Sequence, residues 1–240
     1  MKRPLLFIAI LGLVITSCSL FRSGNGPAQP TDPAGPVNLA RYREENAKLM
    51  PPSPAENRVV FFGDSITENW MLAEYFPGRP FINRGMSSQT TPQMLLRFRA
   101  DVMELKPRVV VILAGTNDLA EKMPLESIEA NIASMAEAAR AERIRVVLAS
   151  LLPVRDIKTL SGREIPNTTL RALAQIAALN DRLKKYSAEK GFVYMDYFSA
   201  MADENGMLRP ELSADGLHPN ENGYEVMKPL ADEAIEAALR

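Results

Sequence analysis

The amino-acid sequence predicts an α/β domain, a three-layer α/β/α sandwich with a mostly parallel central sheet of five strands. Three observations support this fold class. Short apolar runs alternate along the chain with longer segments of helical periodicity, which is the pattern of a parallel sheet whose crossovers are helices. The apolar runs contain few polar residues, as expected of strands buried on both faces. The chain has 240 residues, enough for one well-buried domain and few for two.

Five apolar runs are the expected strands. The first covers residues 58–62 and ends at Gly63. The others are residues 80–82, 108–113, 145–151 and 192–195. Because parallel strands point the same way, their carboxyl ends meet at one edge of the sheet, and ligands of such sheets bind beyond that edge.

The segments between these runs are expected to be helices. Apolar residues recur at helical spacing over residues 92–105, 125–141 and 169–190, and a last helix is expected from about residue 221 to the end. A polar, helix-compatible stretch over residues 38–50 is stopped by a proline-rich segment. Nothing repeats with a fixed period along the chain.

The first residues are typical of an exported protein. Lys2 and Arg3 precede an apolar run over residues 5–15, which is short for a membrane-spanning helix. The run ends in Ile15-Thr16-Ser17-Cys18, which resembles the lipobox of bacterial lipoproteins. This implies a signal peptide over residues 1–17, a lipid on Cys18 and an anchor in the cell envelope, and Ser19 favours the outer membrane. The alternative is an ordinary secretory signal with an incidental cysteine.

A flexible tether is expected over residues 18–37, because this stretch is rich in Gly, Pro, Ser and Ala and offers almost nothing to bury. Residues 38–240 then form the predicted catalytic domain. Cys18 is the only cysteine, so an intramolecular disulfide is excluded. The net charge of −1 and the interleaving of acidic and basic residues argue against binding to nucleic acid. The sequence carries no signal for an oligomeric state.

One serine and one histidine suggest nucleophilic catalysis. A serine hydroxyl attacks well only when a neutral imidazole takes its proton, and a carboxylate must hold that imidazole in one tautomer. His218 is the only histidine in the chain, Asp215 precedes it by three residues, and Ser65 follows the first predicted strand. Taken singly, each has a plainer reading: Ser65 as a helix cap, and the other two as a surface loop.

Two further residues are candidates for stabilising an oxyanion, and both are expected to follow predicted strands. Asn117 could donate through its side-chain amide, and Gly85 through its backbone N–H. The alternative interpretations are that Asn117 is a turn residue and that Gly85 is needed for its backbone dihedral angles.

Together these residues resemble the SGNH hydrolases, also called the GDSL family, over residues 58–224. Four blocks in one order carry the resemblance: Gly63-Asp64-Ser65, Asn83-Arg84-Gly85, Gly115-Thr116-Asn117-Asp118 and Asp215-Gly216-Leu217-His218-Pro219. The resemblance implies a flavodoxin-like sheet.

The same resemblance implies a role for each site residue. Ser65 would be the nucleophile, His218 the general base and Asp215 the residue that orients the imidazole. The Ser65 and Gly85 amides and the Asn117 side chain would form the oxyanion hole. Asp64 is expected to fix the turn by accepting backbone hydrogen bonds and to stay outside the proton relay.

The expected reaction is hydrolysis of an ester through an acyl-serine. Substrates are expected to be small-molecule, glycan or lipid esters with short, acetyl-type acyl groups, as in carbohydrate O-acetyl esterases or acetylhydrolases of the platelet-activating-factor type. A lysophospholipase or thioesterase acting on longer chains is an alternative, and a non-catalytic lipoprotein that binds a glycan or a partner is another. No cofactor and no metal are expected, since one His, one lipidated Cys and scattered carboxylates form no ligand cluster. Residues 151–166 are either a loop over the cleft or an ordinary connection.

Overall fold

The computed structural model describes residues 38–240. The predicted signal peptide, Cys18 and the tether, together residues 1–37, lie outside the described residues. The described part contains a five-stranded sheet in the order β2-β1-β3-β4-β7, and every neighbouring pair in it is parallel. Its strands are β1 (Val59–Gly63), β2 (Phe81–Gly85), β3 (Val109–Leu113), β4 (Arg145–Ala149) and β7 (Val193–Met195). The predicted fold class is confirmed.

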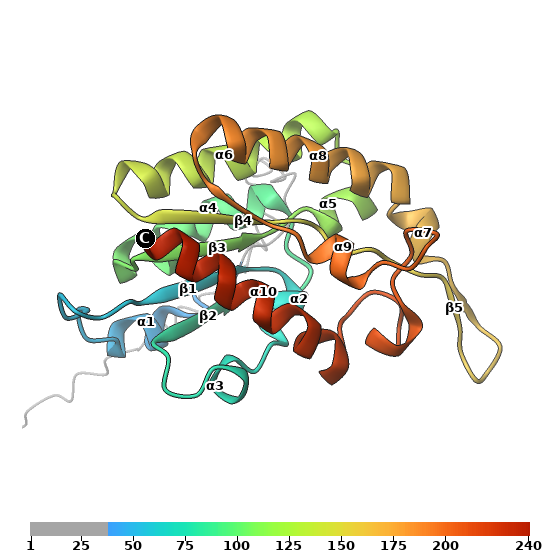
Figure 1. The fold of residues 1–240 in the computed structure, drawn as a ribbon, viewed down its shortest axis with the longest axis horizontal. Coiled ribbons are helices and arrows are strands. Elements are labelled where there is room, and N and C mark those ends of the chain that lie inside the picture. Colours follow the sequence, from blue (N-terminus) through green and yellow to red (C-terminus); the bar gives the residue numbers. More distant parts are fainter. Residues whose placement is uncertain (1–37) are drawn as a thin grey trace, which may run out of the picture. The chain divides into compact units, whose positions relative to one another are not determined.

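Alternate residues of the central strands pack on opposite faces of the sheet. Val60 and Phe62 of β1 lie in one apolar cluster with side chains of α4 (Thr91–Asp101), α6 (Leu125–Ala141) and α8 (Leu173–Lys190). Val59 and Phe61 lie in the other, mainly with side chains of α10 (Glu221–Leu239). Figure 1 shows α10 along one face and α6 with α8 along the other. Burial on both faces explains why these strands are continuous apolar runs.

Short elements complete the described domain. They are α1 (Arg43–Lys48), α2 (Ser65–Glu68), α3 (Leu72–Tyr75), η1 (Met103–Leu105), α5 (Thr116–Ala120), α7 (Asn167–Leu170), α9 (Tyr197–Met201) and η2 (Pro210–Leu212). The helix predicted over residues 92–105 therefore ends at Asp101 and is followed by a 3-10 turn, and the one predicted over residues 169–190 is two helices. No helix in the described range is long and apolar enough to cross a membrane.

The second strand is longer than predicted and contains the candidate residue Gly85. β2 continues to Gly85, so Asn83 and Gly85 lie inside the strand rather than after it, paired with Phe61 and Gly63. A polar residue is tolerated here because the Asn83 side chain is fully engaged: its Nδ2 donates to the carbonyls of Thr67 (2.6 Å) and Trp70 (3.0 Å). The prediction that Gly85 follows the strand was wrong.

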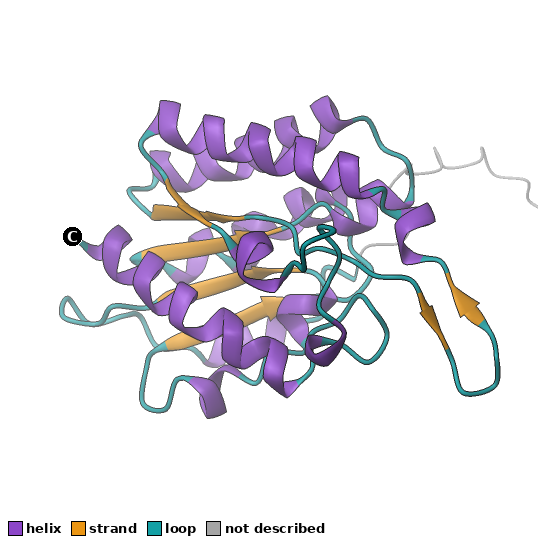
Figure 2. Cartoon of the chain, turned by 45° about the vertical axis from the view of Figure 1, so that its right-hand side comes forward, coloured by secondary structure: helices purple, strands orange, loops and turns teal. Residues whose placement is uncertain are grey.

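The segment after β4 forms a two-stranded antiparallel hairpin, β5 (Ile157–Lys158) with β6 (Glu164–Ile165). Figure 2 shows this hairpin projecting from the body of the described domain. It leads directly into α7, so the segment predicted as a cleft loop or a plain connection is partly a structured arm.

Candidate active site

Ser65 occupies the first position of α2, directly after β1. The turn is fixed by Asp64, whose Oδ1 accepts a hydrogen bond from the Ile66 N–H at 2.9 Å, as the sequence predicted for this carboxylate. Gly63 is needed because a Cβ there would lie 2.1 Å from Thr67 Oγ1 and 2.8 Å from the Leu113 carbonyl oxygen. As the first helical residue, Ser65 has no carbonyl partner within α2 for its own N–H.

The structure brings Ser65, His218 and Asp215 into one hydrogen-bonded chain. Ser65 Oγ lies 2.9 Å from His218 Nε2, and His218 Nδ1 lies 2.6 Å from Asp215 Oδ2. In the tautomer with the proton on Nδ1, the imidazole donates to Asp215 and accepts from the Ser65 hydroxyl. That is the geometry in which the serine can lose its proton to the ring as it attacks.

Asp215 is held as an anion by several donors. Its Oδ1 accepts from the N–H groups of Leu217 (2.9 Å) and His218 (2.8 Å) and from the Ser213 hydroxyl (3.1 Å). Partial burial works against the charge, but the hydrogen bonds from the His218 ring and from these amides prevail and lower the pKa of Asp215 to about 2. The carboxylate is therefore ionised across the neutral pH range.

The histidine loop needs glycine at its centre. Gly216 has a φ of +75°, and a Cβ there would lie 2.1 Å from the Arg155 carbonyl oxygen. Asn167, the first residue of α7, donates through Nδ2 to the carbonyls of Asp215 (2.8 Å) and Arg155 (2.9 Å). The segment after β4 thus supports the loop that carries His218.

Asn117 lies in α5, directly after β3, where the sequence predicted it. Its Nδ2 donates one hydrogen bond to the Gln89 carbonyl at 3.0 Å. A primary amide has two N–H donors, so a second one is available to a ligand. The adjacent Asp118 is buried and accepts from the Thr91 N–H (2.9 Å), which ties α5 to the start of α4.

Gly85 does not fit the role predicted for it. Its N–H donates to the Asn83 side-chain oxygen at 2.8 Å and is already paired. A Cβ at this position would lie 2.1 Å from the backbone nitrogen of Glu68 and 2.6 Å from its Cα, so glycine is needed for the packing of α2 against β2. This close approach, rather than an oxyanion or a positive φ, explains the residue.

Ser88 is a functional candidate that the sequence reasoning missed. It is exposed, it has a φ of +63°, and no partner is recorded for its N–H among residues 38–240. Its loop is pinned beside the nucleophile, because the Met86 N–H donates to the Gly63 carbonyl (3.0 Å) and the Gln89 carbonyl accepts from Asn117. A serine at positive φ is uncommon, and nothing in the sequence signals it.

Arg171 is a second residue that was missed. It follows α7, is only 7% exposed, and donates through Nε to both the carbonyl and the hydroxyl of Thr116 at 3.0 Å. Burial lowers its pKa, and the charges of Asp64 and Asp215 counteract that effect.

In the part of the chain that is described, no group of three or more His, Cys, Asp or Glu side chains is placed to hold a metal ion.

Burial of Asp64 predicts a pH-dependent stability. Burial raises the pKa of this carboxyl from 3.8 to about 6, so the folded chain binds the proton more tightly than the unfolded chain. The stabilisation is fully present below about pH 4 and is lost as the pH rises through about 6. In Asp64→Asn the side-chain oxygen still caps α2, but this loss is absent.

The free energy of unfolding of Asp64→Asn should therefore rise relative to wild type between pH 4 and pH 7.5, by about 3 kcal/mol for a shift of about two pKa units. Urea denaturation of both proteins at several pH values measures the difference. The other carboxyl groups titrate in both proteins and cancel. A difference that does not change with pH would contradict the assignment.

Comparison with known proteins places these residues in a wider group. A family model described as "GDSL-like Lipase/Acylhydrolase family" matches residues 61–226. This range contains Ser65, Asn117, Asp215 and His218.

A solved structure of a GDSL-like lipase from Bacteroides thetaiotaomicron is 40% identical, with a TM-score of 0.75, covering 84% of this chain and 98% of that chain. Esterase TesA of Pseudomonas aeruginosa is 29% identical over 76% of this chain and 93% of its own length. The uncharacterized lipoprotein YqeF of Bacillus subtilis is 29% identical over 40% of this chain, and the match spans about half of its length, 49%.

Proposed function

The chain belongs to the GDSL-like lipase/acylhydrolase family of carboxylic ester hydrolases, and we propose that it cleaves short-chain, acetyl-type esters of carbohydrate or lipid. The observation that carries this proposal is that the hydrogen-bonded triad of Ser65, His218 and Asp215 is complete and exposed to solvent. The His218 and Asp215 side chains are 33% and 46% exposed. An open site admits a bulky, hydrated alcohol group and needs to enclose only a small acyl group.

The mechanism we propose uses the geometry directly. Ser65 Oγ attacks the ester carbonyl carbon while His218 Nε2, at 2.9 Å, takes the hydroxyl proton. The tetrahedral intermediate collapses, the carbon–oxygen bond to the alcohol breaks, and His218 returns the proton to that oxygen. Water then attacks the acyl-serine with the same base, and the acid and free Ser65 are released.

For the oxyanion hole we propose three donors around Ser65. They are the Ser65 N–H, the second N–H of the Asn117 amide and the Ser88 N–H, which replaces the Gly85 amide expected from the sequence. The Gly85 amide is paired with Asn83, whereas the Ser88 amide has no recorded partner in the described range. Fixed donors of this kind stabilise the charge that develops on the carbonyl oxygen.

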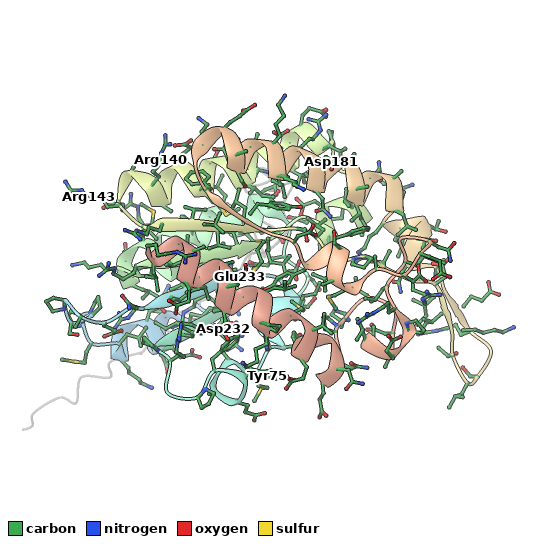
Figure 3. All side chains as sticks on the ribbon, viewed as in Figure 1. Tyr75, Arg140, Arg143, Asp181, Asp232 and Glu233 are labelled. Atoms are coloured by element: carbon green, nitrogen blue, oxygen red, sulfur yellow. The ribbon has the colours of Figure 1, made fainter. Side chains whose placement is uncertain are left out.

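Two cavities of the described domain lie away from the nucleophile. One of about 360 Å³ is lined by Arg145 and Val193, at the amino ends of β4 and β7, and by Arg140 and Arg143, which project from the end of α6 (Figure 3). Another, of about 380 Å³, lies between α1 and α4. Neither is lined by Ser65 or His218, whereas a third, of about 330 Å³, is lined by Met86 and Ser88 and lies beside the proposed oxyanion donor.

A series of 4-nitrophenyl esters from acetyl to palmitoyl tests this proposal. With residues 38–240 as the enzyme, we expect kcat/KM to be highest for acetyl or butyryl and at least about tenfold lower for octanoyl and longer chains. A maximum at long chains would support the lysophospholipase or thioesterase alternative. Absence of hydrolysis across the series would support a binding protein.

We also propose that the chain is exported and anchored through a lipid on Cys18, in the outer membrane. The support is the lipobox-like segment before Cys18, the residue Ser19 and the partial likeness to a protein named as a lipoprotein. Mass analysis of the N-terminal peptide of the membrane-extracted protein tests this. An unmodified Cys18 that is still preceded by residues 1–17 would exclude it.

A further inference from the structure

Arg171 presents hydrogen-bond donors that the protein itself does not use. A guanidinium has five N–H donors. The Nε–H is shared between the carbonyl and the hydroxyl of Thr116, and no partner is recorded in residues 38–240 for the two terminal nitrogens. Fully buried side-chain atoms without a hydrogen-bond partner in this range are Trp70 Nε1, Tyr197 OH and Arg209 Nε. The terminal nitrogens of Arg171 are not among these fully buried atoms, so they are accessible, although only 7% of the residue as a whole is exposed.

The position of Arg171 is fixed between the two sides of the catalytic centre. α7 is bound at its first residue to the histidine loop, where Asn167 donates to the Asp215 carbonyl. Four residues later, Arg171 is bound to Thr116, the residue before Asn117. The hydrogen bonds to Thr116 thus place Arg171 beside Asn117, and the charges of Asp64 and Asp215 counteract the lowering of its pKa by burial.

A buried cation with unused donors favours an anionic ligand. Neither Asp64 nor Asp215 forms an ion pair with Arg171, and the acceptor atoms of Asp215 are occupied by Ser213, Leu217 and His218. Burying a charged group without a partner is costly, and a planar guanidinium matches the two oxygens of a carboxylate.

We propose that the terminal nitrogens of Arg171 bind a carboxylate of the substrate, so that the preferred esters are those of acidic compounds. Arg171 is then a substrate-binding residue that sets specificity. This inference rests on the proposed ester hydrolysis and narrows its substrate class. The carboxylate can belong to the alcohol part, as in an acetylated acidic sugar, or to the acyl part, as in a dicarboxylic half-ester.

Two matched pairs of esters separate these sources. The alcohol-side pair is phenyl acetate with 4-carboxyphenyl acetate, and the acyl-side pair is phenyl pentanoate with monophenyl adipate. The measured quantity is the ratio of kcat/KM for the charged ester to that for its neutral partner. It is compared in wild type, Arg171→Met, Arg171→Lys and the control Arg163→Met, which removes an exposed arginine from the β5–β6 hairpin.

We expect wild type to favour the charged ester of one pair by at least about tenfold, as for a bidentate charge-assisted contact. Arg171→Met should abolish that preference, mainly by raising KM for the charged ester. Arg171→Lys should restore part of the preference, because lysine has the positive charge but not the planar pair of donors of a guanidinium. Arg163→Met should keep the wild-type ratio. Equal ratios in wild type and Arg171→Met for both pairs would overturn the inference while hydrolysis itself still stood.

A binding measurement keeps the inference testable without turnover. Calorimetric titration with 4-hydroxybenzoate and with adipate should give at least about tenfold weaker binding of one of them to Arg171→Met than to wild type. Equal affinity of both proteins for each acid would overturn the inference. If wild type hydrolyses no ester but still binds one of the acids more tightly than Arg171→Met does, the result would count against the proposed function and in favour of the carboxylate site.

Discussion

Replacing Ser65 by alanine should lower kcat/KM for an acetyl ester by roughly 10⁴- to 10⁶-fold. The hydroxyl is the only group of Ser65 that is removed, and its Oγ lies 2.9 Å from His218 Nε2. The Ser65 N–H and the Asn117 amide remain, so a small residual rate from oxyanion stabilisation is expected. Initial rates on 4-nitrophenyl acetate, measured at high enzyme concentration, give the ratio.

The control for this variant is Ser134→Ala, which removes an exposed hydroxyl on α6 that donates to the Ala130 carbonyl. It should retain the wild-type rate. Both variants should keep the thermal midpoint within a few degrees of wild type, because neither opens a cavity in the core. A Ser65→Ala protein that turns over at the wild-type rate would remove Ser65 from the mechanism.

Replacing Asp215 by asparagine should lower kcat by roughly 10⁴-fold while leaving the loop in place. The backbone N–H groups of Leu217 and His218 require an oxygen at the Oδ1 position, at 2.9 and 2.8 Å. The amide NH₂ must then face His218 Nδ1, which is forced to accept. The ring proton moves to Nε2, and that nitrogen can no longer take the proton of Ser65.

Rates at neutral pH and a crystal structure of Asp215→Asn would check this prediction together. Asp232→Asn, in α10 (Figure 3), is the charge-matched control and should be close to wild type. Wild-type turnover of Asp215→Asn with an unchanged loop would mean that the imidazole is oriented by another group.

The fold was predictable because its strands are buried on both faces. β1 and β3 are apolar at nearly every position, and helical spacing is kept over α6 and α10, so periodicity identifies the main strands and the long helices. β2 was cut short because Asn83 and Arg84 look like the end of a strand. Their side chains are satisfied by contacts with α1 and α2 that periodicity does not reveal, such as Arg84 Nε to Asn46 Oδ1 at 2.9 Å.

The grouping of Ser65, Asp215 and His218 was predicted from the resemblance of the four motif blocks to the GDSL family. Ser65 was also expected after a strand, at the carboxyl edge of a parallel sheet, where residues far apart in sequence meet. The hydrogen-bond donors of the oxyanion hole were harder to predict, because a backbone N–H can bind an oxyanion only if it has no other partner. Gly85 was chosen for its residue type, yet its amide is paired with Asn83. The Ser88 amide has no recorded partner among residues 38–240, and Ser88 has a positive φ that serine rarely adopts.

Arg171 illustrates what sequence alone could not supply. Its position depends on α7 being tied to the histidine loop by Asn167 and to the start of α5 by Arg171 itself. Both contacts join segments far apart in the chain, and neither residue lies in a motif. A single arginine in a predicted helix reads as a solvated surface residue, and only its burial in the structure distinguishes it.

Covalent acylation of Ser65 is tested by mass analysis of the protein after reaction with an aryl phosphonate ester. One phosphonyl group should be found on the peptide that contains Ser65. Asp215→Asn should react far more slowly and Ser65→Ala not at all, with loss of esterase activity in proportion to labelling of the wild type. Complete loss of activity with the label on another residue, or full labelling without loss of activity, would contradict the account.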